Sequence, residues 1–119
     1  MTASALSIRL VIADDHPALR AGVRAVLEAS DRITVVAEAG GGAEALRLAR
    51  LHTPDVLLVD VEMPDLDGIA VAEALAAERS TTRVLAFSAY DDRAYVARML
   101  DAGAAGYITK DQPLPLVVE

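Results

Sequence analysis

The segment IRLVIADD, residues 8–15, is a short and mainly apolar run that ends on two adjacent aspartates. The same pattern recurs in DVLLVD (residues 55–60), RVLAFS (residues 83–88) and GYITK (residues 106–110), which end on an aspartate, a serine and a lysine. Short apolar runs with β-branched residues, separated by helical patterns, are typical of buried parallel strands. Ligands of such sheets bind beyond the carboxyl ends of the strands, so these polar residues are predicted to gather at one edge.

The chain alternates throughout between strand and helix patterns. Strands are predicted over residues 8–13, 33–37, 56–59, 84–87 and 107–109, and helices over residues 17–29, 43–52, 68–78 and 92–102. Pro17 suits a first helical position, Asp67 can cap the third helix, and Gly103 can end the fourth. The inward face of the first helix is expected to carry Leu19, Val23, Val26 and Leu27. This alternation predicts a doubly wound α/β sheet.

Length and composition limit the classes of protein to consider. A chain of 119 residues indicates one domain, and 54% hydrophobic with only 3% aromatic residues predicts an aliphatic core. The net charge of −7 argues against binding to nucleic acid, which requires clustered Lys and Arg. The absence of cysteine excludes disulfides and cysteine-based metal sites. No apolar stretch approaches roughly 18 residues and the first ten lack a signal-peptide pattern, so we expect cytoplasm and no membrane partner.

Two segments carry weaker patterns. The glycine run Gly40–Gly42 precedes the second predicted helix, but it lacks the Lys-Ser/Thr of a P-loop and is not GxGxxG, so a plain turn is expected. After Lys110, the segment PLPLVVE (residues 113–119) resembles the start of a fifth helix that is cut off. A helix that covers one sheet face contributes strongly to stability, so we expect the protein to continue beyond Glu119 or a partner to cover that face.

The acidic residues at two predicted strand ends indicate a metal site. Asp14 and Asp15 follow the first strand, and Asp60 ends the third. Two like charges about 4 Å apart repel by about 4 kcal/mol at an effective dielectric near 20, so converging carboxylates need a cation or a proton. Mg²⁺ is the natural candidate because it takes hard oxygen ligands and joins carboxylate to phosphate. Helix capping by Asp15 and loop capping by Asp60 are the structural alternatives.

The same strand ends supply residues suited to phosphate chemistry. Asp60 could act as an exposed carboxylate nucleophile that forms an aspartyl phosphate. The loop after it, VEMPDLDG (residues 61–68), could offer the backbone carbonyl of Glu62 to the metal. Ser88 is either a turn residue or a hydrogen-bond donor to a phosphoryl oxygen. Lys110, the only lysine among eleven cationic residues, provides a compact charge that suits phosphate, although surface lysines are usually only solvated.

Two further side chains have open roles at this stage. His16 could carry a phosphoryl group or bind a metal, but a single histidine beside a proline is more often a loop residue. Tyr107 is either a ring at the edge of the core or a mobile ring that senses the site. The sequence alone does not decide between these alternatives.

Four motifs together resemble the receiver domain of two-component response regulators. They are VIADDHP (residues 11–17), LLVDVEMPDLDG (residues 57–68), LAFSAYDD (residues 85–92) and GAAGYITKD (residues 103–111). The resemblance extends from about Arg9 to Lys110, and the sequence is similar to the NarL/FixJ (LuxR-type) subfamily. It implies a flavodoxin-like fold, with a five-stranded parallel sheet of order 2-1-3-4-5 and five helices, of which the fifth is truncated here.

The resemblance also implies a role for each site residue. It assigns Asp60 as the phosphoacceptor, and it assigns Mg²⁺ to Asp14, Asp15, Asp60 and the backbone carbonyl of Glu62. Ser88, Lys110 and Tyr107 take the phosphate-binding and switch positions. The implied partners are a sensor histidine kinase and a second copy of the chain after phosphorylation. Residues 1–119 are then one receiver domain, not a classical enzyme, and DNA is bound only through an output domain absent from this chain.

Three rival hypotheses remain open from the residues themselves. A phosphatase of the haloacid dehalogenase type also uses a strand-end aspartate, but it expects a second aspartate where this chain has Glu62. A flavodoxin-like FMN module needs a hydroxyl- and glycine-rich loop after the first strand, where Asp14 and Asp15 would repel phosphate. A purely structural interaction domain with an unused site is the third.

Overall fold

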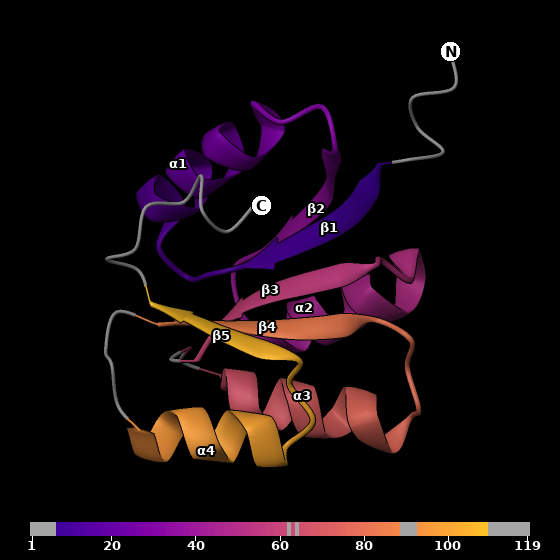
Figure 1. The fold of residues 1–119 in the computed structure, drawn as a ribbon, viewed down its shortest axis with the longest axis vertical. Coiled ribbons are helices and arrows are strands. Elements are labelled where there is room, and N and C mark those ends of the chain that lie inside the picture. Colours follow the sequence, from indigo (N-terminus) through magenta and orange to yellow (C-terminus); the bar gives the residue numbers. More distant parts are fainter. Residues whose placement is uncertain (1–6, 62, 64, 89–92, 110–119) are drawn as a thin grey trace.

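The computed structural model describes residues 7–61, 63, 65–88 and 93–109. Within them, five strands form one parallel sheet of order β2-β1-β3-β4-β5, alternating in sequence with four helices (Figure 1). The strands are β1 (Ile8–Ala13), β2 (Ile33–Ala39), β3 (Val56–Asp60), β4 (Arg83–Ser88) and β5 (Gly106–Thr109). The helices are α1 (Pro17–Glu28), α2 (Gly42–His52), α3 (Gly68–Ala77) and α4 (Arg93–Asp101). The predicted fold class and sheet order are confirmed.

Helices cover both faces of the sheet, which explains why the central strands are apolar throughout. On one face, Leu10, Ile12 and Leu58 pack in a cluster with residues of α1. On the other face, the alternate residues of β1 and β3 pack in a larger cluster with residues of α2, α3 and α4, as Figure 1 shows for the layers. Val11 and Leu57 belong to this second cluster and are fully buried. The two-residue period of each strand therefore supplies both halves of the core.

The predicted element boundaries agree with the structure to within about two residues. Pro17 is the first residue of α1, as its fixed φ favours. The carboxylate of Asp67 caps α3 by accepting a hydrogen bond from the backbone nitrogen of Ala70 at 2.9 Å. Gly103 follows α4 with φ of 106°, a left-handed conformation that favours glycine. The predicted start of a fifth helix lies outside the described residues.

The predicted inward face of α1 is only partly correct. Val23 and Leu27 are buried against the sheet and Val26 is half-buried, but Leu19 is 38% exposed. All residues of the first turn, 17–19, are exposed, so α1 reaches the sheet only beyond that turn. Helical periodicity identifies the face of a helix, but it does not tell where along its length the contact begins.

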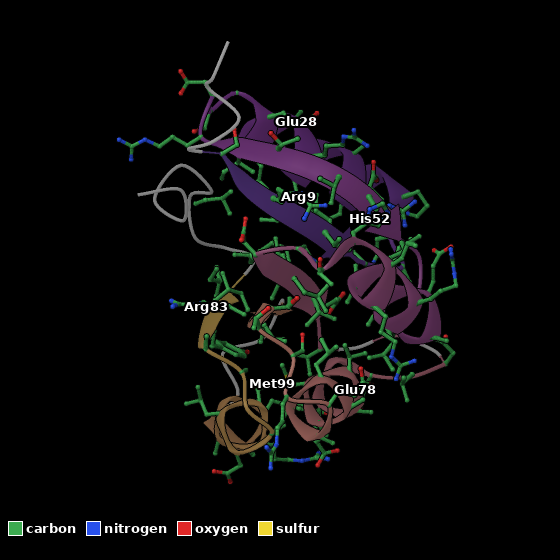
Figure 2. All side chains as sticks on the ribbon, turned by 90° about the vertical axis from the view of Figure 1, so that its right-hand side faces the viewer. Arg9, Glu28, His52, Glu78, Arg83 and Met99 are labelled. Carbon is green, nitrogen blue, oxygen red and sulfur yellow. The ribbon has the colours of Figure 1, made fainter. Side chains whose placement is uncertain are left out.

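At the amino end of the sheet, Arg9 connects three segments that are distant in sequence. Its guanidinium donates a hydrogen bond from Nη1 to the carbonyl oxygen of His52, at the end of α2, over 2.8 Å (Figure 2). Its backbone nitrogen donates to the carboxylate of Asp55, just before β3, over 2.9 Å. The bond to His52 satisfies a carbonyl group that the end of α2 leaves without a helical partner.

The register of the sheet determines which residues meet at its carboxyl edge. Ala13, the last residue of β1, pairs with Val59 of β3. Asp14, which follows Ala13, therefore lies beside Asp60, which follows Val59. On the far side, Ser88 of β4 pairs with Thr109 of β5. The backbone thus places Asp14, Asp60 and Ser88, the polar residues of three apolar runs, along one edge of the sheet.

Gly40 and Gly41 form the predicted turn between β2 and α2, and Gly42 begins α2. This run also makes a tight contact with the loop after β3. A Cβ atom on Gly42, the first residue of α2, would lie 1.9 Å from the carbonyl oxygen of Leu66. A Cβ atom on Gly41 would lie 2.8 Å from a carboxylate oxygen of Asp65. The loop between β3 and α3 therefore packs directly on the backbone at the start of α2, and only glycine leaves room for it.

A pair of glycine substitutions tests this contact. Gly42→Ala is expected to destabilise the protein by about 3 kcal/mol, because the backbone of Leu66 must move to accept a methyl group. Gly22→Ala is the matched control: nothing lies within 4 Å of its Cβ position, inside α1. It should stabilise the protein by about 0.5–1 kcal/mol through the helix propensity of alanine. Urea unfolding measures both, and equal stabilities of the two variants would contradict the proposed contact.

Candidate functional site

Three carboxylates from two strand ends converge at the carboxyl edge of the sheet. Asp14 and Asp15 directly follow β1, and Asp60 is the last residue of β3. One ligand atom from each of these residues and from His16 lies within 4.8 Å of the others. Asp14 and Asp60 are only 2% and 3% exposed, whereas Asp15 is half-buried. The structure thus brings together the three aspartates that the sequence places at separate strand ends.

His16 contacts both members of the acidic pair. Its Nδ1 forms a hydrogen bond with Oδ1 of Asp14 at 3.0 Å and lies 3.1 Å from Oδ1 of Asp15. Its backbone nitrogen also donates to Oδ1 of Asp14 over 2.9 Å. The ring is 65% exposed, so it covers the two carboxylates from the solvent side. The sequence favoured a plain loop residue at this position, and the adjacency of His16 to the two aspartates was the available indication.

The donor set at this edge fits a hard divalent cation. Carboxylate oxygens are ligands that Mg²⁺ prefers, and Mg²⁺ typically keeps several waters beside one or two carboxylates. Within the described residues, Oδ1 of Asp15 is buried and accepts no hydrogen bond, and its one reported contact is the ion-pair contact with Nδ1 of His16 at 3.1 Å. A buried carboxylate oxygen is costly unless a donor or a cation satisfies it. The residues present therefore fit Mg²⁺, which the predicted ligands Asp14, Asp15 and Asp60 would hold.

The other predicted site residues are placed less completely. Ser88 ends β4 at the same edge, but its side chain lies outside the described part of the structure. Glu62 and Lys110 are also outside the described residues, so their roles stay predictions. Tyr107 lies in β5 beside Ala86 of β4, half-buried against the larger core cluster. That position corresponds to the edge of the core.

The loop after Asp60 is held by contacts that the sequence did not reveal. The carboxylate of Asp65 accepts hydrogen bonds from the backbone nitrogens of Gly42 at 2.9 Å and Ala43 at 3.1 Å, at the start of α2. These hydrogen bonds, together with one from the backbone of Leu66, lower the pKa of Asp65. The partners are more than twenty residues apart, so no local pattern indicates the contact.

A second contact fixes the carbonyl side of Asp60 itself. A Cβ atom on Gly68, the first residue of α3, would lie 2.7 Å from the carbonyl oxygen of Asp60. The backbone nitrogen of Gly68 donates to the carbonyl oxygen of Val61 over 3.0 Å. Helix α3 therefore begins directly against the end of β3, and this close approach explains a glycine at the end of the loop.

Comparison with protein families gives one match over most of the chain. The family model described as "Response regulator receiver domain" matches residues 10–118. The protein named "Probable transcriptional regulatory protein NarL" of Mycobacterium tuberculosis is 45% identical over 112 residues. This match covers 94% of the present chain and 52% of the relative. The transcriptional regulatory protein DegU of Brevibacillus brevis is 35% identical, over 94% of the present chain and 48% of DegU.

Solved structures resemble the present one in fold as well as in sequence. The signal receiver domain of NarL from Mycobacterium tuberculosis superposes with a TM-score of 0.92 at 45% identity, covering 94% of this chain and 90% of that one. A LuxR-family two-component response regulator from Aurantimonas gives a TM-score of 0.89 at 34% identity, over 94% and 80% of the two chains. The present chain spans about half the length of the curated relatives it matches. In the described part of the chain, no helix is long and apolar enough to cross a membrane.

The lowered pKa of Asp65 predicts a pH-dependent stability. A carboxyl group whose pKa is lower in the folded than in the unfolded state stabilises the fold above its unfolded pKa, about 3.9. This contribution is lost as the pH falls through the folded pKa. Asp65→Asn should therefore be less stable than the unsubstituted protein at neutral pH, with a gap that narrows on acidification.

Urea unfolding at about pH 7 and about pH 3 measures this gap. Asp31→Asn, at an exposed position in the turn before β2, is the control and should show no such gap at either pH. An Asp65→Asn gap that stays constant or widens on acidification would show that the carboxylate does not anchor the loop.

Proposed function

The chain belongs to the response regulator receiver domain family, and on that premise we propose that Asp60 accepts a phosphoryl group in the presence of Mg²⁺. The relatives are of the NarL and LuxR type, and the donor is a phosphohistidine on a sensor histidine kinase. The observation that supports this proposal most directly is the convergence of Asp14, Asp15 and Asp60 within 4.8 Å. A nucleophilic carboxylate beside a fitted cation site is what phosphoryl transfer to an aspartate requires.

The chain's residues divide the reaction between nucleophile and ion binding. Asp14, Asp15, Asp60 and the backbone carbonyl of Glu62 would hold Mg²⁺. When bound, Mg²⁺ neutralises charge on the phosphoryl oxygens. A carboxylate oxygen of Asp60 attacks phosphorus in line, so that an O–P bond forms while the P–N bond of the donor histidine breaks. The product is an acyl phosphate with a charge of about −2, and the donor histidine is regenerated.

The other predicted site residues then bind the new phosphoryl group. Lys110 provides an ammonium for the phosphoryl oxygens and Ser88 a hydroxyl donor. The pairing of Ser88 with Thr109 supports this assignment, because it brings the ends of β4 and β5 to the edge where Asp60 lies. Movement of Ser88 frees space into which Tyr107 turns, and the surface of α4 and β5 changes. A phosphoryl group shifts this equilibrium only by its differential affinity for the two states.

The biological output lies outside the domain described here. The relatives that the chain matches are named as transcriptional regulatory proteins and are about twice as long as the matched segment. We infer that residues 1–119 form the receiver domain of such a regulator in the cytoplasm. Phosphorylation promotes a homodimer, and DNA is bound through a separate output domain. The chain's own chemistry is phosphotransfer to itself and slow loss of that group, rather than turnover of an external substrate.

Substitution of the phosphoacceptor tests the central assignment. The unsubstituted protein should gain one phosphoryl group per chain from acetyl phosphate with Mg²⁺, and none once EDTA removes the metal. Asp60→Asn should gain none while keeping its fold, because the amide is not a nucleophile for phosphorus. Asp31→Asn, at an exposed position away from the strand ends, should be labelled normally. Intact-protein mass spectrometry gives the stoichiometry, and full labelling of Asp60→Asn would refute the assignment.

The role of the single lysine can be tested without changing charge. Lys110→Arg should weaken phosphorylation-dependent dimerisation about tenfold, because a planar guanidinium replaces a compact point charge. Sedimentation velocity with and without acetyl phosphate measures the dimer. Arg47→Lys makes the opposite exchange on an exposed position of α2 and should leave dimerisation unchanged. Normal dimerisation of Lys110→Arg would remove any special role of the lysine.

A further inference from the structure

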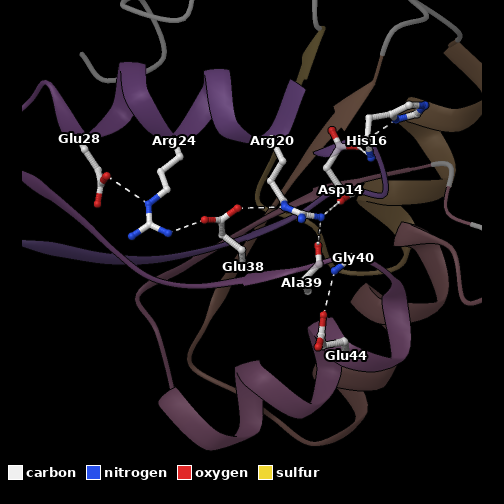
Figure 3. A network of polar contacts seen from close by, with 9 residues as sticks. All are labelled: Asp14, His16, Arg20, Arg24, Glu28, Glu38, Ala39, Gly40 and Glu44. Carbon is white, nitrogen blue, oxygen red and sulfur yellow. Dashed lines mark hydrogen bonds and ion pairs between the residues drawn. The ribbon is translucent and has the colours of Figure 1, made fainter. Parts of the chain in front are cut away.

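Three charged side chains of α1 and one of β2 form a network that ends beside the acidic pair (Figure 3). They are Glu28, Arg24 and Arg20 of α1 and Glu38 of β2. Nε of Arg24 donates to a carboxylate oxygen of Glu28 at 3.1 Å, and Nη1 of Arg24 donates to Oε2 of Glu38. The other oxygen of Glu38 accepts a hydrogen bond from Nε of Arg20 at 2.9 Å. Two cations and two carboxylates thus alternate, and the network carries no net charge of its own.

Arg20, the last member of this network, holds the backbone of the proposed metal site. Its Nη1 donates to the carbonyl oxygen of Asp14 at 2.7 Å and reaches the carbonyl oxygen of Ala39 at 3.5 Å (Figure 3). The backbone nitrogen of Asp14 also donates to the carbonyl oxygen of Ala39, at 3.0 Å. Both backbone polar groups of Asp14 are therefore fixed, one by β2 and one by Arg20.

The carbonyl that Arg20 binds belongs to the peptide unit between Asp14 and Asp15. A peptide unit is planar, so the orientation of this carbonyl also sets the direction of the nitrogen and Cα of Asp15. Rotation of the unit would swing the carboxylate of Asp15 relative to those of Asp14 and Asp60. Residues that hold metal ligands in orientation typically change metal affinity about 10–100-fold when they are replaced.

The influence of Arg20 is geometric rather than a matter of charge. Its guanidinium is already paired with Glu38, and the pKa of Glu38 is lowered, chiefly by the hydrogen bond from Arg24 and further by that from Arg20. The side chains of Arg20 and Glu38 are 21% and 25% exposed, so their positions are restricted by packing. A paired guanidinium contributes little net field at the metal site, whereas its short bond to the carbonyl of Asp14 acts directly on the backbone.

We propose that Arg20 is a positioning residue for Mg²⁺ binding, oriented by Glu38 and acting through the peptide unit between Asp14 and Asp15. This inference rests on the proposed function, because it concerns the same site. It adds a residue of α1 to a site otherwise made from strand ends.

The test compares two arginines of the same helix that share the partner Glu38. Arg20→Gln removes the hydrogen bond to Asp14, whereas Arg24→Gln removes ion pairs of the same network and leaves the site backbone untouched. Mg²⁺ is titrated into each protein and the backbone amide shifts of residues 14–16 are followed by NMR. Arg20→Gln should raise the Kd for Mg²⁺ about tenfold, and Arg24→Gln by less than about twofold. The amide resonance of Asp15 should move in Arg20→Gln even before Mg²⁺ is added.

The outcomes separate this inference from the proposed function. If the unsubstituted chain binds no Mg²⁺, the proposed function fails and this inference fails with it. If the unsubstituted chain binds Mg²⁺ but Arg20→Gln binds equally well, or if Arg24→Gln loses as much affinity, the inference alone is overturned. If Arg20→Gln does not fold, Arg20→Lys decides: it keeps the charge without the planar fork and should lose about threefold in affinity. Unchanged affinity in that folded variant would overturn the positioning role.

Discussion

The structure depends on holding three carboxylates close together at one edge of a sheet. At about 4 Å and an effective dielectric near 20, each pair of charges costs about 4 kcal/mol, against a total domain stability of about 5–15 kcal/mol. Asp14 and Asp60 are almost fully buried, so water relieves little of this repulsion. The fold must therefore supply enough apolar burial elsewhere to tolerate the site. A hard divalent cation bound between the carboxylates would offset this repulsion, which is why the donor set fits such an ion.

The supports of this site act mainly on the backbone. Val11, Leu57 and Val59 are fully buried, so β1 and β3 are packed within the core up to the residues that precede the site. Beyond the last ladder pair, tertiary contacts replace sheet hydrogen bonds: Asp65 ties the loop after β3 to α2, and Arg20 binds the carbonyl of Asp14. A carboxylate on such a backbone has only its own two rotatable bonds left. A backbone held in this way limits the positions that the carboxylate oxygens can take, which would favour binding of Mg²⁺.

The sequence predicted those parts of the molecule that depend on local pattern. Apolar runs and helical periods gave the elements, and parallel strands necessarily bring their carboxyl ends to one edge, so the meeting of Asp14 with Asp60 followed without coordinates. Contacts between distant segments were not predictable in this way. Asp65 and Gly42 are 23 residues apart, and Arg20 and Glu38 are 18 apart. Their pairing depends on how a loop or a helix lies over the sheet. The periodic spacing of apolar residues along the sequence does not determine that arrangement.

The contacts that hold Asp14 and the proposed switch residues lie on different strands of the sheet. Among the described residues, the hydrogen bonds that hold the backbone of Asp14 come from α1 and β2. The loop after Asp60 is held by α2 through Asp65, and also by β4, because the backbone nitrogen of Val61 donates to the carbonyl oxygen of Phe87 at 3.2 Å. The proposed switch residues Ser88 and Tyr107 lie on β4 and β5. Under the proposed function, Asp14 would keep its place because α1 and β2 hold its backbone, whereas Asp60 is paired with β4 and would pass the effect of a phosphoryl group to that strand.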